Sequence, residues 1–274
     1  MLAEYDIIVV GAGHAGCEAA SAAATMGAKV LLITLDMTKI ASMSCNPAMG
    51  GIAKGQILRE IDALGGQSGI VTDKSMIQFR LLNRSKGPAM WSPRAQCDRN
   101  LFSLNWRTIL ENNKNIDIWQ DSVNELLIDK LVVRGVKTRL GVKFFAKIVI
   151  LTIGTFENGL MHIGKVQIKG GRMSEPFSTG ISEQLKNLGF ICGRLKTGTP
   201  ARIDGRTIDF NKLKEQPGDN ENRKFSFLNY EVDYSKHKSC YIAFTNKEVH
   251  DILKTGFDDS PLFDGTITSI GPRY

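Results

Sequence analysis

One glycine motif constrains the fold of this chain more than any other feature. Gly11–Gly16 reads GAGHAG; it follows the apolar run Asp6–Val10 and opens a segment of small residues that ends at Gly27. A second apolar run, Lys29–Thr34, comes directly after this segment. Continuous apolar runs of this length are typical of strands that are buried on both faces. Strand, glycine turn, helix and strand in close succession predict a βαβ unit with a parallel sheet.

The spacing of the three glycines predicts a dinucleotide site. Gly11 permits a tight turn, Gly13 lets the backbone approach a pyrophosphate, and Gly16 lets helix and strand pack closely. The N-terminus of the helix adds N–H donors and a positive dipole for the phosphates. An acid about 20 residues further on binds the ribose in such folds, and Asp36 has this position. The predicted cofactor contacts are Gly11, Ala12, Gly13, His14, Ala15, Gly16 and Asp36.

The order of elements after the second strand distinguishes between FAD and NAD. A plain NAD fold would continue with further βαβ units. This chain instead has a long loop, a helical stretch and a strand-rich segment from Ser122 to Ile153, which we interpret as a β-meander that leads back into a buried strand. That order is similar to a glutathione-reductase-type flavoprotein, in which a T-x-G turn closes the FAD domain. We therefore predict an α/β Rossmann fold that binds FAD, with Gly154 and Thr155 at the cofactor.

Length and composition fit a globular protein of two domains. The chain has 274 residues, of which 42% are hydrophobic and 23% are charged, and these values exclude a disordered chain. After Pro200 the sequence becomes polar, with short turns rich in Gly, Asn and Asp. We predict an FAD-binding domain at 1–199, a smaller inserted α/β domain at 200–270 and a return to the first domain at 271–274. No apolar run is long enough to span a membrane, and no targeting segment precedes the first strand, so we expect a cytoplasmic protein.

The cysteines argue against a disulfide framework and against a metal site. The five cysteines include no CxxC pair, and the four histidines form no ligand cluster with them. Cys17 and Cys192 lie in apolar settings and are predicted to be core residues.

Cys45 is the candidate catalytic thiol. It lies in Ser44–Gly51 (SCNPAMGG), which we expect to lead into a helix. Helix N-terminal amides and Lys54 would favour the thiolate and make it nucleophilic. The alternative is a small buried residue with no chemical role.

Residues 80–107 form a basic segment with six Lys and Arg residues, a single acid and the tryptophans Trp91 and Trp106. The whole chain has a net charge of +7. A solvated charged face is one explanation, and an electrostatic contact with nucleic acid is the other. The candidate phosphate contacts are Arg80, Arg84, Lys86, Arg94 and Arg99.

Several longer motifs point to one family. The sequence contains GAGHAGCEAA, SCNPAMGGIAKG, EIDALGG, IQFRLLNRSKGPA, RLKTGTPARI and a closing GPRY. From Tyr5 to Tyr274 the chain resembles the MnmG (GidA) family, the flavoproteins of tRNA wobble-uridine modification. The resemblance implies FAD at the glycine motif, with further contacts from Val123 and Ser178. It also implies NADH binding by the inserted domain and by Gly271, Pro272, Arg273 and Tyr274.

The resemblance also implies an activity and partners. The family adds a carboxymethylaminomethyl or aminomethyl group to C5 of uridine 34 of tRNA. NADH reduces the flavin and methylenetetrahydrofolate donates the one-carbon unit. A GTPase, MnmE, is the expected partner, and a homodimer and a heterotetramer with MnmE are the expected assemblies.

Two thiols carry the family's chemistry. One matches Cys45, as nucleophile or as the acid/base that resolves the adduct, and the other follows the GPRY motif. The chain therefore resembles an N-terminal part, which we expect to be inactive by itself.

Three alternatives to this function remain. A TrmFO-like folate- and FAD-dependent tRNA uridine methyltransferase shares the glycine fingerprint, although SCNPAMGG and KGPA favour MnmG. A flavin disulfide reductase would need a redox dithiol, which is absent. A non-catalytic RNA-binding module that retains the fold is the third alternative.

Overall fold

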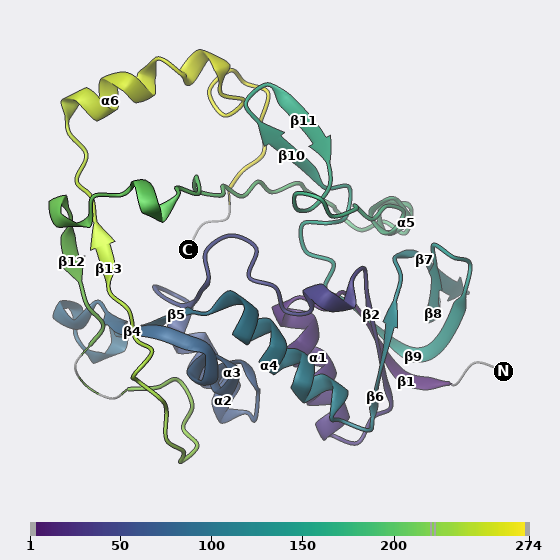
Figure 1. Cartoon of the computed structure of the whole chain (residues 1–274). Helices are drawn as coiled ribbons and strands as arrows, with labels where there is room; N and C mark the ends of the chain where they lie inside the picture. The colour runs from purple at the N-terminus through teal and green to yellow at the C-terminus, as the bar shows by residue number, and fades with distance from the viewer. Residues whose placement is uncertain (1–3, 220, 222, 272–274) are drawn as a thin grey trace.

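The computed structural model describes residues 4–219, 221 and 223–271. Its main sheet has the strand order β6-β2-β1-β9-β8-β7 (Figure 1). The parallel strands are β1 (Tyr5–Val10), β2 (Val30–Thr34), β6 (Ile116–Gln120) and β9 (Lys143–Leu151). Helix α1 (His14–Thr25) connects β1 to β2, which confirms the predicted βαβ unit.

Both faces of this sheet are covered, as the continuous apolar runs predict. Val9 and Leu32 point to one face, where α1 and α4 (Arg99–Glu111) pack with side chains such as Phe102 and Trp106. Ile8 and its neighbours point to the other face. Because successive side chains of a strand alternate between faces, a strand with cover on both sides must be apolar throughout.

The predicted meander is confirmed. Strands β7 (Val123–Asp129) and β8 (Val132–Thr138) pair antiparallel, and β8 pairs in the same way with the start of β9. The later part of β9 then runs parallel to β1. The meander and α5 (Ile181–Asn187) cover the second face, and Ile181 is fully buried there.

A second layer lies beside α1 and α4. It contains α2 (Gly55–Ala63), α3 (Ser68–Ser75) and a three-stranded antiparallel sheet of order β3-β5-β4. These strands are β3 (Ala48–Gly50), β5 (Ser92–Cys97) and β4 (Met76–Leu82). The Cys45 segment leads into α2 as expected, but strand β3, which was not predicted, comes before the helix. Gly50 and Gly51 have φ values of +78° and +95°, so the chain passes from strand β3 through a turn before α2 begins at Gly55.

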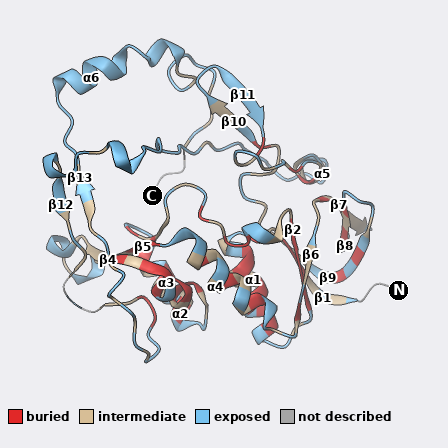
Figure 2. Ribbon diagram, in the orientation of Figure 1, coloured by how far each residue is buried: buried red, intermediate tan, exposed pale blue. Residues whose placement is uncertain are grey.

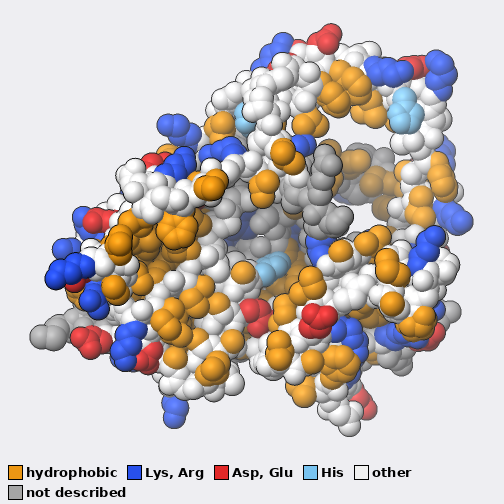
Figure 3. Space-filling model, turned by 180° about the vertical axis from the view of Figure 1, so that it is seen from behind, with side chains coloured by type: hydrophobic (Ala, Val, Ile, Leu, Met, Phe, Trp, Pro, Cys, Tyr) orange, Lys and Arg blue, Asp and Glu red, His pale blue; other side chains and the backbone are white. Residues whose placement is uncertain are grey.

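The later part of the chain is open and exposed. Its elements are β10 (Leu160–Ile163), β11 (Val166–Lys169), β12 (Lys214–Gln216), β13 (Cys240–Ile242) and α6 (Lys247–Lys254). Figure 1 shows them as an arch from α5 through β12 and β13 to α6. Figure 2 shows α6 and β11 exposed and β10 partly so, and Figure 3 shows apolar side chains on the outer surface of the molecule.

Part of the predicted inserted domain packs on the first half of the chain. Phe225 is fully buried against Phe79, with 5.5 Å between the ring centroids. The carboxylate of Asp73 accepts the backbone N–H groups of Phe225 and Ser226 at 2.6 and 2.9 Å. Leu195 and Ile270 form a parallel bridge, so the segment between these two residues begins and ends at the same place in the structure. The division into domains at 199 and 270 stays a prediction.

One side-chain prediction was wrong, and one ring of the basic segment is not available to a ligand. Cys192 is exposed rather than core, because residues 190–195 lie on the surface after α5. Trp106 is fully buried among the residues of α1 and α4, so this ring is not part of a nucleic-acid surface. Cys17 is buried as predicted.

Within the described ranges, no helix is both long and apolar enough to cross a bilayer.

Candidate functional site

The glycine loop has the geometry that a dinucleotide site needs. A Cβ atom on Gly16 would lie 1.8 Å from the carbonyl oxygen of Gly11, and a Cβ on Gly11 would lie 2.6 Å from that of Thr152. These two positions therefore require glycine for close packing of β1, α1 and β9. A Cβ on Gly13 would meet nothing within 4 Å. The space above Gly13 is open, as expected where a ligand approaches the backbone.

The first turn of α1 faces this open space. Gly13 is the N-cap residue and has no side chain to bond the N–H groups of the first turn. These donors have no partner inside the helix and form an anion-binding site. Thr152 supports the loop from below, since its Oγ1 donates to the carbonyls of Val10 and Gly11 at 3.0 and 2.9 Å. Sequence reasoning missed Thr152, although the T-x-G turn contains it.

The other predicted cofactor residues follow the carboxyl ends of the parallel strands. Asp36 follows β2, Val123 lies three residues after β6, and Gly154 and Thr155 follow β9. Ligands of open α/β sheets bind at this edge. The structure thus places Asp36, Val123, Gly154 and Thr155 at the sheet edge that carries Gly11–Gly16, and the role of each residue remains a prediction.

Three of these residues have distinct environments. The Oδ1 atom of Asp36 accepts the N–H and the hydroxyl of Thr38, both at 2.7 Å, and these bonds lower the pKa of Asp36. Ser178 is buried, and its hydroxyl donates to Glu157 at 2.9 Å, so the loop after β9 holds it. Val123 is buried at the start of β7, where it pairs with Thr138 of β8.

His14 connects the glycine loop to the loop that carries Cys45. Its Nε2 atom lies 3.1 Å from the carbonyl oxygen of Ala41, and its ring packs on Phe102 at 5.2 Å between centroids. The N–H of Ala41 donates to the carbonyl of Ala12 at 2.8 Å. Both polar backbone groups of Ala41 are therefore bonded to the glycine loop. Burial lowers the pKa of His14.

Cys45 lies half-buried four residues beyond Ala41. Its Sγ atom is 3.6 Å from the carbonyl oxygen of Gly198, which is 153 positions away in the sequence. Arg99, at the start of α4, donates to the carbonyl of Cys45 at 3.2 Å. The thiol is accessible and its loop is held from two sides. The sequence did not indicate the contact with Gly198.

Gly271 lies close to this thiol loop. The N–H of Lys196 donates to the carbonyl of Ile270 at 3.1 Å, and Gly271 follows directly. Lys196 is two residues from Gly198, so the described end of the chain lies near the Cys45 contact. Of the four predicted NAD contacts, Pro272, Arg273 and Tyr274 lie outside the described residues.

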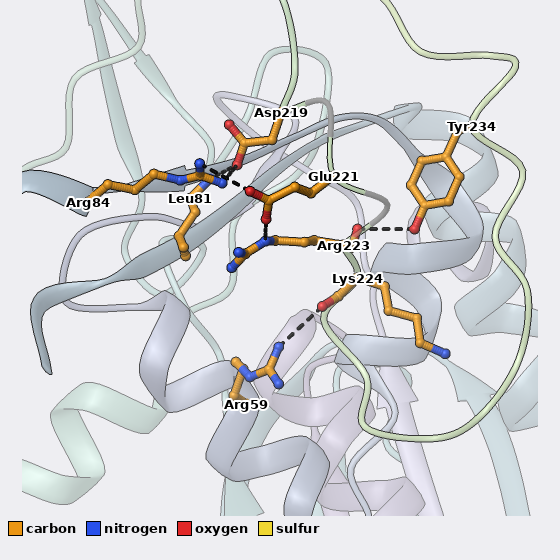
Figure 4. Close-up of polar contacts among 8 residues, drawn as sticks. All are labelled: Arg59, Leu81, Arg84, Asp219, Glu221, Arg223, Lys224 and Tyr234. Atoms are coloured by element: carbon orange, nitrogen blue, oxygen red, sulfur yellow. Dashed lines mark hydrogen bonds and ion pairs between the residues drawn. The ribbon is translucent and has the colours of Figure 1, made fainter. Parts of the chain in front are cut away.

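The structure divides the five basic candidates into groups. Arg84 forms ion pairs with Asp219 at 3.0 Å and with Glu221 at 3.5 Å (Figure 4). Arg99 holds the Cys45 loop. Lys86 is exposed in the turn after β4. Arg80 and Arg94 lie opposite each other in the small sheet.

Among the residues that the structure describes, no group of three His, Cys, Asp or Glu side chains could hold a metal ion.

The parallel sheet, the open glycine loop and the uncapped helix define a Rossmann-type dinucleotide-binding protein. The comparisons make this class more specific. The family model described as Glucose inhibited division protein A matches residues 6–274. The chain therefore belongs to the GidA family.

Its relatives include curated tRNA uridine 5-carboxymethylaminomethyl modification enzymes MnmG. The enzyme of Parabacteroides distasonis is 62% identical over 274 residues, which are 100% of this chain and 44% of that protein. The enzyme of Cytophaga hutchinsonii is 60% identical with the same coverage. The chain thus spans less than half the length of these relatives.

Solved structures agree with this assignment. GidA of Aquifex aeolicus in its form I crystal has a TM-score of 0.91 and 44% identity, over 99% of this chain and 46% of that one. The GidA-related protein of Thermus thermophilus has a TM-score of 0.50 and 24% identity, over 69% of this chain and 70% of that one, and shows the shared fold alone.

Proposed function

We propose that this chain forms the FAD-binding part of an enzyme that modifies C5 of the wobble uridine in tRNA. One observation carries the proposal. The glycine loop and the Cys45 loop are joined by the two hydrogen bonds of Ala41, so a cofactor site and an accessible thiol belong to one structural unit. The relatives named MnmG support the same substrate.

The residues present fit an FAD molecule. The open space above Gly13 and the uncapped N-terminus of α1 suit its pyrophosphate, and Asp36 suits a ribose hydroxyl. The other predicted contacts lie in nearby segments: Gly154 and Thr155 follow β9, and Val123 begins β7. The hydroxyl of Ser178 donates to Glu157 in the loop after β9. Bound FAD supplies hydride chemistry that side chains cannot perform.

Cys45 is the proposed catalytic residue. C5 of uracil is a weak nucleophile until a group adds to C6. Attack of the Cys45 thiolate forms an S–C6 bond and moves the C5–C6 π electrons into an enolate, whose C5 then attacks an electrophilic methylene carbon. Removal of the proton from C5 restores the double bond as the S–C6 bond breaks and the thiolate leaves. The other role for Cys45 is the acid/base that resolves this adduct, with a second thiol as the nucleophile.

The finer parts of the proposal follow from the family. Methylenetetrahydrofolate would supply the carbon, and NADH would supply electrons through the segment at 200–270 and Gly271. The adjacency of Lys196 and Ile270 supports an insertion between these points. A cytoplasmic homodimer that forms a heterotetramer with the GTPase MnmE completes the proposal.

A reconstituted reaction tests this function. The protein from the complete gene is incubated with an unmodified tRNA transcript, FAD, NADH, methylenetetrahydrofolate, ammonium, the GTPase and GTP. We expect a mass increase at the wobble uridine for the wild type and for the control Cys192→Ser, whose thiol is exposed and remote in sequence. Cys45→Ser is expected to bind flavin but form no product. Product formation by Cys45→Ser at the wild-type rate would exclude Cys45 as a catalytic residue.

A further inference from the structure

Two arginines lie directly opposite each other in the small antiparallel sheet. Arg80 on β4 pairs in register with Arg94 on β5. Directly opposite residues of an antiparallel pair point to the same face, with about 4.5–5.5 Å between their Cβ atoms. The two guanidinium groups therefore start from adjacent points on one face of the sheet.

Among the residues that the structure describes, no carboxylate compensates this pair of charges. The Nε atoms of Arg80 and Arg94 are both buried and have no hydrogen-bond partner, and neither side chain forms an ion pair with a described residue. Of the other eleven described arginines, six form ion pairs: Arg84, Arg107, Arg134, Arg172, Arg206 and Arg223. Three more donate to backbone carbonyls: Arg59, Arg99 and Arg194. Like charges directly opposite each other destabilise a sheet, so this arrangement suits an anion.

Two glycines lie beside Arg94. Gly50 is its neighbour on β3, and a Cβ on Gly51 would lie 3.8 Å from the Cδ of Arg94, so neither residue covers this arginine with a side chain. The opposite face of the sheet is closed, because Phe79 and Ala95 are buried there with Phe225.

One end of the sheet face that carries Arg80 and Arg94 is covered by other segments of the chain. Gln78, in register with Gln96, donates to the carbonyls of Gln216 and Lys238 at 3.0 and 3.3 Å. The segments around β12 and β13 therefore close this end of the face, while Arg80 and Arg94 remain partly exposed.

We propose that Arg80 and Arg94 form one oxyanion-binding site that takes a phosphate group of the RNA substrate. Guanidinium groups match the geometry of phosphate and carboxylate oxygens with paired N–H donors. The inference rests on the proposed function and assigns these two residues, rather than the whole basic segment, to the contact. Arg84 is engaged by Asp219 and Glu221, as Figure 4 shows, and Arg99 by the Cys45 loop.

The position of the pair fits an RNA whose uridine reaches Cys45. Gly50 lies five residues after Cys45, so the Cα atoms of Gly50 and Cys45 are at most roughly 18 Å apart. Gly50 pairs in turn with Arg94. Enzymes that act on a single base also contact the nucleotides that flank it. A phosphate on Arg80 and Arg94 would belong to such a flanking nucleotide.

The test compares tRNA binding by Arg80→Gln/Arg94→Gln with binding by the wild type over a range of salt concentrations. The control is Arg134→Gln/Lys137→Gln, which removes the same charge from two partly exposed side chains on strand β8 of the other sheet. We expect the double variant at 80 and 94 to bind several-fold more weakly, with a salt slope shallower by about 0.7 for each phosphate released. Its thermal midpoint without ligand should not fall, because a like-charge contact is removed.

The outcomes separate this inference from the proposed function. If the wild type binds no tRNA, the proposed function fails and this inference fails with it. If the wild type binds tRNA and the variant binds equally well with an unchanged slope, only the present inference is overturned. A variant with unchanged tRNA binding but weaker binding of a folate polyglutamate would identify a carboxylate site and overturn the phosphate assignment.

Discussion

Replacement of Gly13 by alanine tests the cofactor site without disturbing the fold. A Cβ at this position meets nothing within 4 Å, and the backbone angles of φ −74° and ψ −174° suit alanine. Exchange of glycine for alanine at an N-cap changes stability by at most about 1 kcal/mol. A pyrophosphate that approaches this backbone would meet the added methyl group at a cost of about 1–3 kcal/mol, which is about 5- to 150-fold in affinity.

Two further variants complete this experiment. Gly205→Ala also places its Cβ in open space, remote from the sheet, and should change neither stability nor flavin affinity. In Gly16→Ala the Cβ would lie 1.8 Å from the carbonyl oxygen of Gly11, so we expect a loss of stability of about 3 kcal/mol or more. Flavin fluorescence titration gives the affinity and urea unfolding gives the stability. Wild-type flavin affinity in Gly13→Ala would refute the proposed position of the pyrophosphate.

Three other predictions concern the supports of the site. Burial keeps the pKa of His14 below its ordinary 6.5, so the contribution of this residue to the free energy of unfolding should be complete above pH 6.5 and decline as the pH falls below it. Unfolding of His14→Gln should show a smaller decline over this range, and His237, whose pKa burial also lowers, contributes in the same direction. An unchanged pH dependence in His14→Gln would contradict the role of its burial. Arg99→Gln should alter the alkylation rate of Cys45 and lower the free energy of unfolding by at most about 1.5 kcal/mol. The control Arg107→Gln breaks the exposed ion pair with Glu111 on the same helix and should leave the alkylation rate unchanged. Asp73→Asn should lower the free energy of unfolding, measured in urea, by about 2 kcal/mol. The Asp73 carboxylate accepts hydrogen bonds from Phe225, Ser226 and the Tyr230 hydroxyl, and an amide there has no charge and adds a competing donor. A change below about 0.5 kcal/mol would show that these bonds do not hold the segment around Phe225.

Local patterns predicted the first half of the fold well. The two apolar runs, the glycine spacing and the small residues of α1 constrain one another within a short stretch, and the structure confirms the βαβ unit that they predict. The β-meander was also readable, because its strands are consecutive and their pairs are local. The grouping of Asp36, Gly154 and Thr155 at one edge follows from the parallel direction of β2 and β9.

Contacts between distant segments could not be predicted in this way. Nothing in the local sequence indicates that Gly198 meets the Cys45 thiol or that Asp73 holds Phe225. The exposure of Cys192 and the burial of Trp106 also depend on which segments cover them. The strand at Ala48–Gly50 was missed because a three-residue strand is defined by its partner β5 rather than by its own periodicity.

The tRNA nucleosides of cells that lack this gene test the central claim most directly. Mass spectrometry of the hydrolysed tRNA measures the C5 side chain of the wobble uridine. We predict that this side chain is lost in the deletion strain, returns with the complete gene and does not return with a Cys45→Ser copy. An unchanged wobble uridine in the deletion strain would contradict the proposed function, and loss of a T-loop methyl group instead would indicate the TrmFO-like activity.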